Sequence, residues 1–166
     1  MALTHIIFDW GDTLMVDFPE KPGPMADWDI VEVMPDIVDV LEILKDKYTL
    51  VVATNAGASD TAMMQKALFR GNIDHFFSHF FSSKDLGYSK PDVKFFLEIC
   101  NQMNIFPEHC VFVGNDYIKD IEGAAAAGMF SIFFNHAGWK GDMSAAHSVI
   151  HSFSEITSIL TPMRSS

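Results

Sequence analysis

Basic residues are scarce in this sequence. It has 11 Lys and Arg residues against 22 Asp and Glu residues, which gives a formal net charge of −11. Duplex DNA or another polyanion is therefore not expected as the main partner, because neutralising its phosphates requires Lys and Arg. A small phosphorylated substrate is compatible with this charge, since a bound cation can offset its phosphate.

Long apolar runs and cysteines are also scarce. No run approaches the roughly 18 residues that suggest a membrane span, and the N-terminus lacks the basic and apolar segments of a signal peptide. The two cysteines, Cys100 and Cys110, do not have the spacing of a metal site. We interpret them as buried thiols in a reducing compartment, and we expect a cytoplasmic protein that makes no membrane contact.

Core-forming residues, by contrast, are plentiful. Hydrophobic residues make up 49% of the 166 residues, and charged residues make up 20%. This composition is typical of a globular protein and not of a disordered one. The length fits one domain over residues 1–166.

Apolar runs and helical patterns alternate along the chain. The runs read as strands covered on both faces, because they are rich in Val, Ile and Phe and show little alternation; they lie at residues 5–8, 49–53, 79–83, 110–114 and 130–135. The helical patterns lie at residues 35–47, 58–69, 91–103, 117–128 and 154–160. The predicted fold class is α/β, a doubly wound three-layer α/β/α (Rossmann-like) parallel sheet of about five strands.

Polar residues follow three of the predicted strands directly. Asp9 follows the first strand, Thr54 the second, and Asn115 with Asp116 the fourth. In open α/β sheets, ligands bind outside the carboxyl ends of the strands. We therefore expect these side chains to meet at one edge of the sheet.

Four motifs carry a resemblance to a known family. The stretches "FDWGDTL", "VVATN", "GYSKPD" and "VGNDYIKDIEGAAAAGM" resemble, in order and context, the four motifs of the haloacid dehalogenase (HAD) superfamily. The resemblance runs from residue 5 to about residue 135, and it is nearest to the phosphatase-like members. It implies a hydrolase that transfers a phosphoryl group to an aspartate.

Phosphoryl transfer through a covalent intermediate requires a nucleophile, and Asp9 is the candidate carboxylate. Because a carboxylate and a phosphate repel each other, we expect Mg²⁺ between them, which prefers oxygen ligands. Asp9, the Gly11 carbonyl, Asp116 and Asp120 are the predicted metal ligands. The alternative for the last two is a helix N-terminus whose dipole favours acidic residues.

The second and third motifs supply the predicted phosphate-binding residues. A hydroxyl and backbone amides after a strand can bind a phosphoryl oxygen, which assigns substrate binding to Thr54 and Asn55. The resemblance implies that Lys90 steadies the negative charge of nucleophile and phosphate. An ordinary helix cap at Thr54 and a solvated surface lysine at Lys90 are the structural alternatives.

The sequence departs from the family pattern at two places. The pattern has a second Asp two residues after the nucleophile, followed by Gly, and that Asp protonates the leaving group. Here Gly11 takes the place of the acid and Asp12 follows it. The pattern also has Asp directly after the Gly of the fourth motif, where this chain has Asn115 and then Asp116. Whether Asp12 replaces the missing acid, and whether Asn115 or Asp116 contacts the metal, stay open.

Residues 15–34 contain three prolines and have no clear period, and we interpret them as a short flap over the site. A plain surface connection is the alternative. They are too few for a helical cap domain, so we expect no separate cap and an open site. A homo-oligomer would be one way to close it.

The sequence therefore predicts a Mg²⁺-dependent phosphate monoester hydrolase that forms an aspartyl-phosphate and is slow because of Gly11. The substrate would be a small phosphorylated compound of unknown identity. The alternative is a catalytically weak regulatory protein of the same fold that binds phosphate or metal. A dehalogenase is less favoured, because the acidic metal ligands look retained and a metal offers that reaction no obvious benefit.

Overall fold

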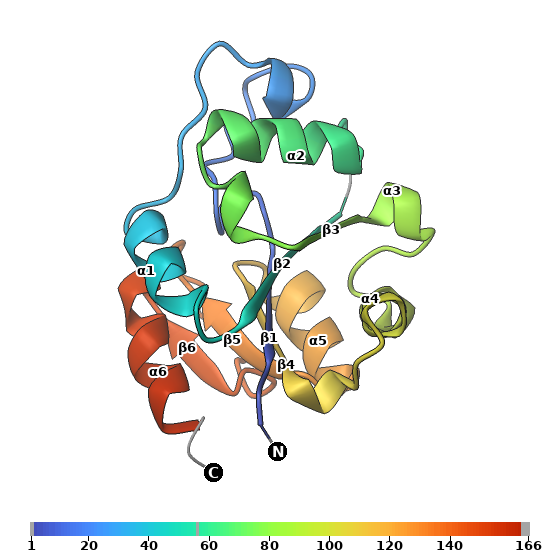
Figure 1. Cartoon of the computed structure of the whole chain (residues 1–166), viewed down its shortest axis with the longest axis vertical. Coiled ribbons are helices and arrows are strands. Elements are labelled where there is room, and N and C mark those ends of the chain that lie inside the picture. The colour runs from blue at the N-terminus through green and yellow to red at the C-terminus, as the bar shows by residue number, and fades with distance from the viewer. Residues whose placement is uncertain (1, 56, 164–166) are drawn as a thin grey trace.

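A computed structural model of the chain describes residues 2–55 and 57–163 (Figure 1). Its centre is one parallel sheet of six strands in the order β3-β2-β1-β4-β5-β6. The strands are β1 His5–Phe8, β2 Thr49–Thr54, β3 His79–Ser82, β4 Cys110–Gly114, β5 Phe130–Phe134 and β6 Ser148–Ile150. The predicted doubly wound α/β fold is confirmed.

The sixth strand was missing from the sequence prediction of about five strands. β6 has only three residues, and it pairs with β5 from Ser148 opposite Ile132 to Ile150 opposite Phe134. Only Ile150 of β6 is fully buried. A strand of three residues, of which only Val149 and Ile150 are apolar, is too short for its sequence pattern to reveal it.

Helices cover both faces of the sheet (Figure 1). The α-helices are α1 Ile37–Leu44, α2 Thr61–Arg70, α3 Ser83–Leu86, α4 Val93–Met103, α5 Gly123–Ala126 and α6 Ile156–Met163. Short 3₁₀ turns lie at η1 Met25–Asp27, η2 Asp74–Phe76, η3 Pro107–His109 and η5 Phe153–Glu155. No helix in the described part of the chain is long and apolar enough to cross a membrane.

Alternation along the strands divides the core into two layers. Ile6 and Phe8 of β1 pack in the cluster that holds α1, α2 and α6, whereas Ile7 packs in the cluster that holds α4. Successive side chains of a strand point to opposite faces, so a strand covered on both faces must be apolar throughout. Cys100 and Cys110 lie buried in the second layer as free thiols, as predicted, with their sulfur atoms 4.0 Å apart.

The predicted helix over residues 117–128 consists of two pieces. Tyr117–Glu122 is a π-helical turn (η4), and α5 begins only at Gly123. A π-turn holds one more residue than an α-turn, and such turns are frequent at functional sites. Here the wider turn lets Asp116 cap the helix while Asp120 faces inward.

The segment over residues 15–34 is ordered and packs against α2 (Figure 1). The Arg70 guanidinium donates to the carbonyls of Ala26 at 3.0 Å, Trp28 at 2.5 Å and Asp29 at 3.2 Å. These bonds satisfy backbone groups that no strand or helix pairs. No separate cap domain is present in the described residues, as the sequence predicted.

Gly123 offers a test of how closely α5 packs on α4. A Cβ there would overlap the Phe96 ring and lie 3.0 Å from the carbonyl oxygen of Pro91. We expect Gly123→Ala to lower the free energy of unfolding by about 1–3 kcal/mol, the usual cost of overpacking. The measurement is chemical denaturation, with Gly57→Ala as control because a Cβ at Gly57 would meet nothing within 4 Å. Equal effects of the two changes would contradict this packing.

Candidate active site

Asp9 lies at the carboxyl end of β1, next to the point where the strand order reverses. Its backbone amide donates to the carbonyl of Val113 in β4 at 2.9 Å, which fixes its position between the two strands. The Asp9 side chain is mostly buried, with 8% of the residue exposed. In doubly wound sheets, the crevice at this reversal is where ligands bind.

Lys90 joins two carboxylates under this edge. Its Nζ atom donates to Asp9 Oδ1 at 2.8 Å and to Asp120 Oδ1 at 2.6 Å. Burial by itself disfavours the ammonium, but the charges of Asp120 and Asp9 outweigh it, so the pKa of Lys90 is raised above its ordinary value. The lysine is therefore a fixed positive charge. Because it is buried, the alternative of a solvated surface lysine is excluded.

Asn55 holds Lys90 in place. Its side-chain amide accepts from the Lys90 backbone N–H at 2.8 Å and donates to the Lys90 carbonyl at 3.0 Å. The Asn55 side chain is thus occupied by the backbone of Lys90, and the predicted substrate contact of Asn55 depends on its backbone amide. Thr54, next to it at the end of β2, is buried and donates weakly to the Asn55 carbonyl at 3.3 Å.

Asp120 is buried behind Asp9. Burial and the nearby Asp9 charge raise the pKa of Asp120 to about 7, while Lys90 acts in the opposite direction. Its second oxygen accepts from the Asp116 backbone amide at 3.1 Å. A Cβ at Gly114 would overlap this carboxylate, which explains the glycine at the end of β4.

The two polar residues after β4 face different ways. The Asp116 carboxylate accepts from the Lys119 backbone amide at 2.9 Å and so caps the π-turn. The Asn115 amide faces Asp9 Oδ2, the Gly11 carbonyl and the Thr13 hydroxyl; with its nitrogen turned toward them it donates at 3.0, 3.2 and 3.2 Å. The side chain beside Asp9 is therefore that of Asn115.

The oxygen atoms around Asn115 form a set of donors that could hold a cation. With the Asn115 amide in its other orientation, its oxygen joins Asp9 Oδ2 and the Gly11 carbonyl, which makes a set of oxygen donors of the kind that Mg²⁺ prefers. Within residues 2–55 and 57–163, no three His, Cys, Asp or Glu side chains gather in this way. The donor set fits Mg²⁺ through an amide and a backbone carbonyl, and it does not include the Asp116 carboxylate.

The Asp12 side chain turns toward the backbone of Asp17. It adopts a left-handed backbone conformation with φ of 58°, which Asp tolerates better than most residues. Its carboxylate accepts from the backbone amide of Asp17 at 2.9 Å. Partial burial and the neighbouring charges of Asp12 and Asp9 raise the pKa of Asp17 above its ordinary value.

Two hollows flank the strand ends. One, of about 170 Å³, lies between the loop after β1, the segment over residues 15–34 and the loop after β2; its lining includes Gly11, Asp17, Thr54 and Asn55. The other, of about 270 Å³, is lined by Asn115, Asp116, Tyr117, Trp139 and neighbouring residues. Asp9 itself lines neither hollow, but Gly11 lines the first and Asn115 lines the second.

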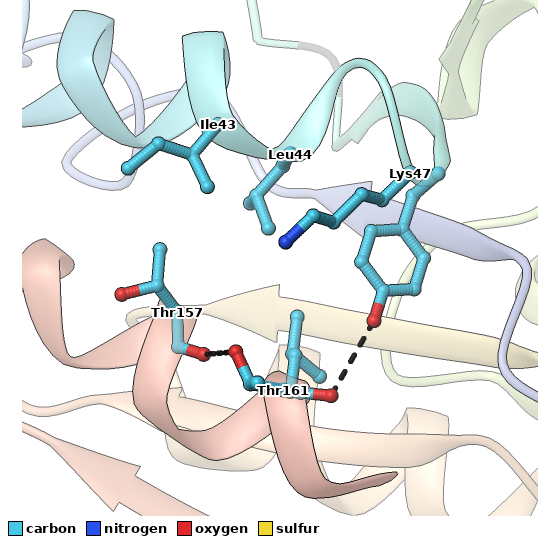
Figure 2. Close-up of a pocket in the computed structure, with 7 residues that line it drawn as sticks. Ile43, Leu44, Lys47, Thr157 and Thr161 are labelled. Atoms are coloured by element: carbon cyan, nitrogen blue, oxygen red, sulfur yellow. Dashed lines mark hydrogen bonds between the residues drawn. The ribbon is translucent and has the colours of Figure 1, made fainter. Parts of the chain in front are cut away.

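A further cavity of about 270 Å³ lies between α1 and α6, with Lys47, Thr157 and Thr161 at its wall (Figure 2). The hydroxyl of Tyr48 on its wall donates to the Leu160 carbonyl at 3.5 Å. Tyr48 precedes β2, so this cavity lies at the amino end of the strand, opposite the Asp9 edge. None of its lining residues is acidic.

The fold and the site together define a Rossmann-like α/β protein with a carboxylate–lysine–carboxylate group at the carboxyl edge of its sheet. A family model described as haloacid dehalogenase-like hydrolase matches residues 11–128. The chain belongs to this family. The match begins two residues after Asp9, so the nucleophile assignment depends on the geometry given above.

Relatives and solved structures agree with this family. The chain is 36% identical over 135 residues to a glyceraldehyde 3-phosphate phosphatase of Methanothermobacter thermautotrophicus, covering 81% of this chain and 58% of that protein. It is 34% identical over 93 residues to a phosphoglycolate phosphatase of Haemophilus influenzae, covering 55% of this chain and 40% of that protein. The chain thus spans about half the length of these relatives.

In three dimensions the chain is similar to an uncharacterized protein from Listeria monocytogenes serotype 4b, with a TM-score of 0.87 and 23% identity, covering 99% of this chain and 100% of that one. It is also similar to a HAD phosphatase from Thermococcus onnurineus, with a TM-score of 0.79 and 18% identity, covering 98% and 100%. At these identities the likeness shows the fold.

Two residues near the site were not singled out from the sequence. Thr13 is fully buried, and its hydroxyl lies 3.4 Å from Asp9 Oδ2. Asp17 lies beside Gly11 across a turn. Thr13 lies within the first motif and could have been included, but nothing in the sequence ties Asp17 to Gly11.

Lys90 provides a test of the buried charges. We expect Lys90→Met to lower the free energy of unfolding by about 3–5 kcal/mol, because two buried carboxylates lose their partner. The matched control is Lys94→Met, one turn further on and exposed, which should change it by no more than about 0.5 kcal/mol. Urea denaturation measures both, and similar losses in the two variants would contradict the assignment.

Proposed function

We propose that this protein is a Mg²⁺-dependent phosphate monoester hydrolase that acts through an aspartyl-phosphate. The observation that carries the proposal is the Asp9 carboxylate, fixed at the switch point of the sheet by Lys90 on one oxygen and facing Asn115 with the other. Such a carboxylate is a positioned nucleophile at the place where doubly wound proteins bind ligands.

In the first step, a carboxylate oxygen of Asp9 attacks phosphorus and the bond from phosphorus to the leaving oxygen breaks. In the second step, a water oxygen attacks the same phosphorus, the bond to Asp9 breaks, and inorganic phosphate leaves. Lys90 keeps its positive charge throughout and offsets the charge that gathers on Asp9 and the phosphoryl oxygens. The Thr54 hydroxyl and backbone amides after β2 would bind those oxygens.

Three groups would hold Mg²⁺ in this scheme: Asp9, the carbonyl of Gly11 and the side-chain oxygen of Asn115. Asp120 would act behind them by keeping Lys90 charged and oriented, and Asp116 would serve as a helix cap. When bound, the ion offsets the repulsion between the nucleophile and the phosphate. YfnB from Bacillus subtilis, 30% identical over 98 residues, has been crystallised with magnesium, which supports this cofactor.

The relatives suggest the class of substrate. Two of them act, by name, on glyceraldehyde 3-phosphate and on phosphoglycolate, both small alkyl phosphates. The open hollow beside Thr54 and Asn55 would admit such compounds. We propose a small phosphorylated metabolite as the substrate, with the site covered by the segment over residues 15–34 or by a second subunit.

One observation favours a second candidate function. Gly11 has no side chain to protonate a leaving group, which suits a catalytically weak regulatory protein that binds phosphate or metal. The two functions differ in turnover. An aryl phosphate needs little protonation of its leaving group, so it tests the nucleophile separately from the acid.

The first test is hydrolysis of 4-nitrophenyl phosphate by the wild-type protein with and without Mg²⁺. We expect turnover with the ion, and none above background in Asp9→Asn, because an amide is a far weaker nucleophile than a carboxylate. Thermal unfolding should confirm that the variant is folded. Turnover that survives Asp9→Asn would exclude the aspartyl-phosphate, and no turnover by the wild type would favour the regulatory alternative.

The second test distinguishes the metal ligands. Asn115→Ala should weaken Mg²⁺ binding by more than about tenfold, a loss that even outer groups of a metal site cause. Asp116→Ala removes a full charge one residue away and should change the affinity little, since its carboxylate caps a helix. Calorimetric titration of both variants measures this difference, and a larger loss in Asp116→Ala would reverse the assignment.

A further inference from the structure

This inference deepens the proposed function and depends on it. Hydrolysis of an alkyl phosphate has to expel an alkoxide, which is a poor leaving group unless it is protonated. A positioned acid typically accelerates such reactions by about 10²–10⁴-fold. Position 11 cannot supply the proton, because it is glycine. The acid must therefore come from another part of the chain if alkyl phosphates are substrates.

The Asp17 side chain lies where a side chain of residue 11 would point. A Cβ on Gly11 would lie 3.6 Å from the Cβ of Asp17 and 3.7 Å from its Oδ2 atom. These are ordinary van der Waals distances, so Asp17 approaches the empty position closely without filling it. The carboxylate of Asp17, six residues further along the chain, thus lies next to position 11, where the family pattern has an acid and this chain has glycine.

The order of Gly11 and Asp12 explains how the chain turns back. Asp12 takes the left-handed conformation, and its backbone amide donates to the Met15 carbonyl at 2.6 Å. Its carboxylate accepts from the Asp17 amide at 2.9 Å, and its carbonyl bonds His136 Nε2 at 2.8 Å. Asp12 thus closes the turn, and Gly11, which has no side chain, leaves room for the side chain of Asp17.

Asp17 also shares a hollow with the predicted phosphate site. The hollow of about 170 Å³ is lined by Asp17 and Gly11 on one side and by Thr54 and Asn55 on the other. Asp17 is exposed at its edge. A leaving oxygen and a water molecule can both reach this carboxyl group, whereas the Asp12 carboxylate already serves the turn.

We propose that Asp17 is the general acid and base of the reaction, and that Asp12 is a positioning residue. As the bond from phosphorus to the leaving oxygen breaks, the Asp17 carboxylic acid gives its proton to that oxygen, and the alcohol departs. The Asp17 carboxylate then takes a proton from water while the water oxygen attacks the phosphorus on Asp9. This step releases inorganic phosphate and returns Asp17 to its acid form.

The test compares two leaving groups in Asp17→Asn, which keeps the size of the side chain. With phosphoglycolate and glyceraldehyde 3-phosphate, we expect turnover to fall by about 10²–10⁴-fold. With 4-nitrophenyl phosphate, a rapid burst approaching one nitrophenolate per site should remain, followed by slow turnover. The burst survives because phosphorylation of Asp9 needs no acid here, while the slow phase reflects the lost base.

Two matched controls bear on the assignment. Glu32→Gln removes an exposed carboxylate from the same segment and should leave the turnover of both substrates unaffected. Asp12→Asn keeps the left-handed turn and the oxygen that accepts from Asp17, and should retain most alkyl-phosphate turnover. A loss in Asp12→Asn equal to that in Asp17→Asn, with the same leaving-group dependence, would transfer the acid role to Asp12.

A rescue variant completes the test. Gly11 lies outside the left-handed region and has room for a Cβ, and Asp17→Ala vacates the space beyond that Cβ. Gly11→Asp added to Asp17→Ala should therefore restore alkyl-phosphate turnover at least tenfold over Asp17→Ala alone. If the wild type hydrolyses both substrate classes and Asp17→Asn leaves both unchanged, or lowers the burst as much as the alkyl rate, the acid role is wrong and the phosphatase remains. If it hydrolyses only aryl phosphates, no acid operates. If it hydrolyses neither, the proposed function itself fails.

Discussion

The ammonium of Lys90, buried between the carboxylates of Asp9 and Asp120, is the interaction on which the site depends. Two carboxylates so close together in a buried place repel each other, and the positive charge of the Lys90 ammonium between them offsets this repulsion. Lys90 reaches this position from the loop before α4, where the Asn55 side-chain amide holds its backbone. Three strand ends are thereby tied to Lys90: β1 through Asp9, β2 through Asn55, and β4 through the turn that carries Asp120.

Several backbone features follow from this requirement. Gly114 leaves room for the Asp120 carboxylate, and Gly123 lets α5 approach Phe96 and the carbonyl of Pro91, directly after Lys90. Between β4 and the π-turn, the Asn115 side chain faces Asp9, whereas the Asp116 side chain caps the turn. The amide of Asn115 brings an oxygen to this edge without adding a third negative charge beside Asp9.

The loop after β1 shows how a departure from a motif can be accommodated. Because the acid and the glycine of the pattern are exchanged, Asp12 takes a left-handed backbone conformation, and Gly11, which has no side chain, lies near Asp9. Asp12 also forms a turn with the backbone of Asp17, and this turn brings the Asp17 side chain next to Gly11. The segment that carries Asp17 continues along α2, where Arg70 fixes its carbonyls, so the hollow beside Thr54 has an ordered wall.

The sequence by itself determined the sheet, the helices that alternate with it and the edge that holds the site. Apolar strands covered on both faces and strand-end polar residues are local patterns, and parallel strands bring their carboxyl ends together by necessity. The strand β6 was not predicted from the sequence, because three residues are too few to form a recognisable strand pattern. Tertiary structure alone decided which of Asn115 and Asp116 faces Asp9, since the directions of these two adjacent side chains depend on the backbone between β4 and the π-turn. It also decided that Asp17 meets Gly11, because that contact depends on a turn whose hydrogen bonds the linear order of residues does not reveal.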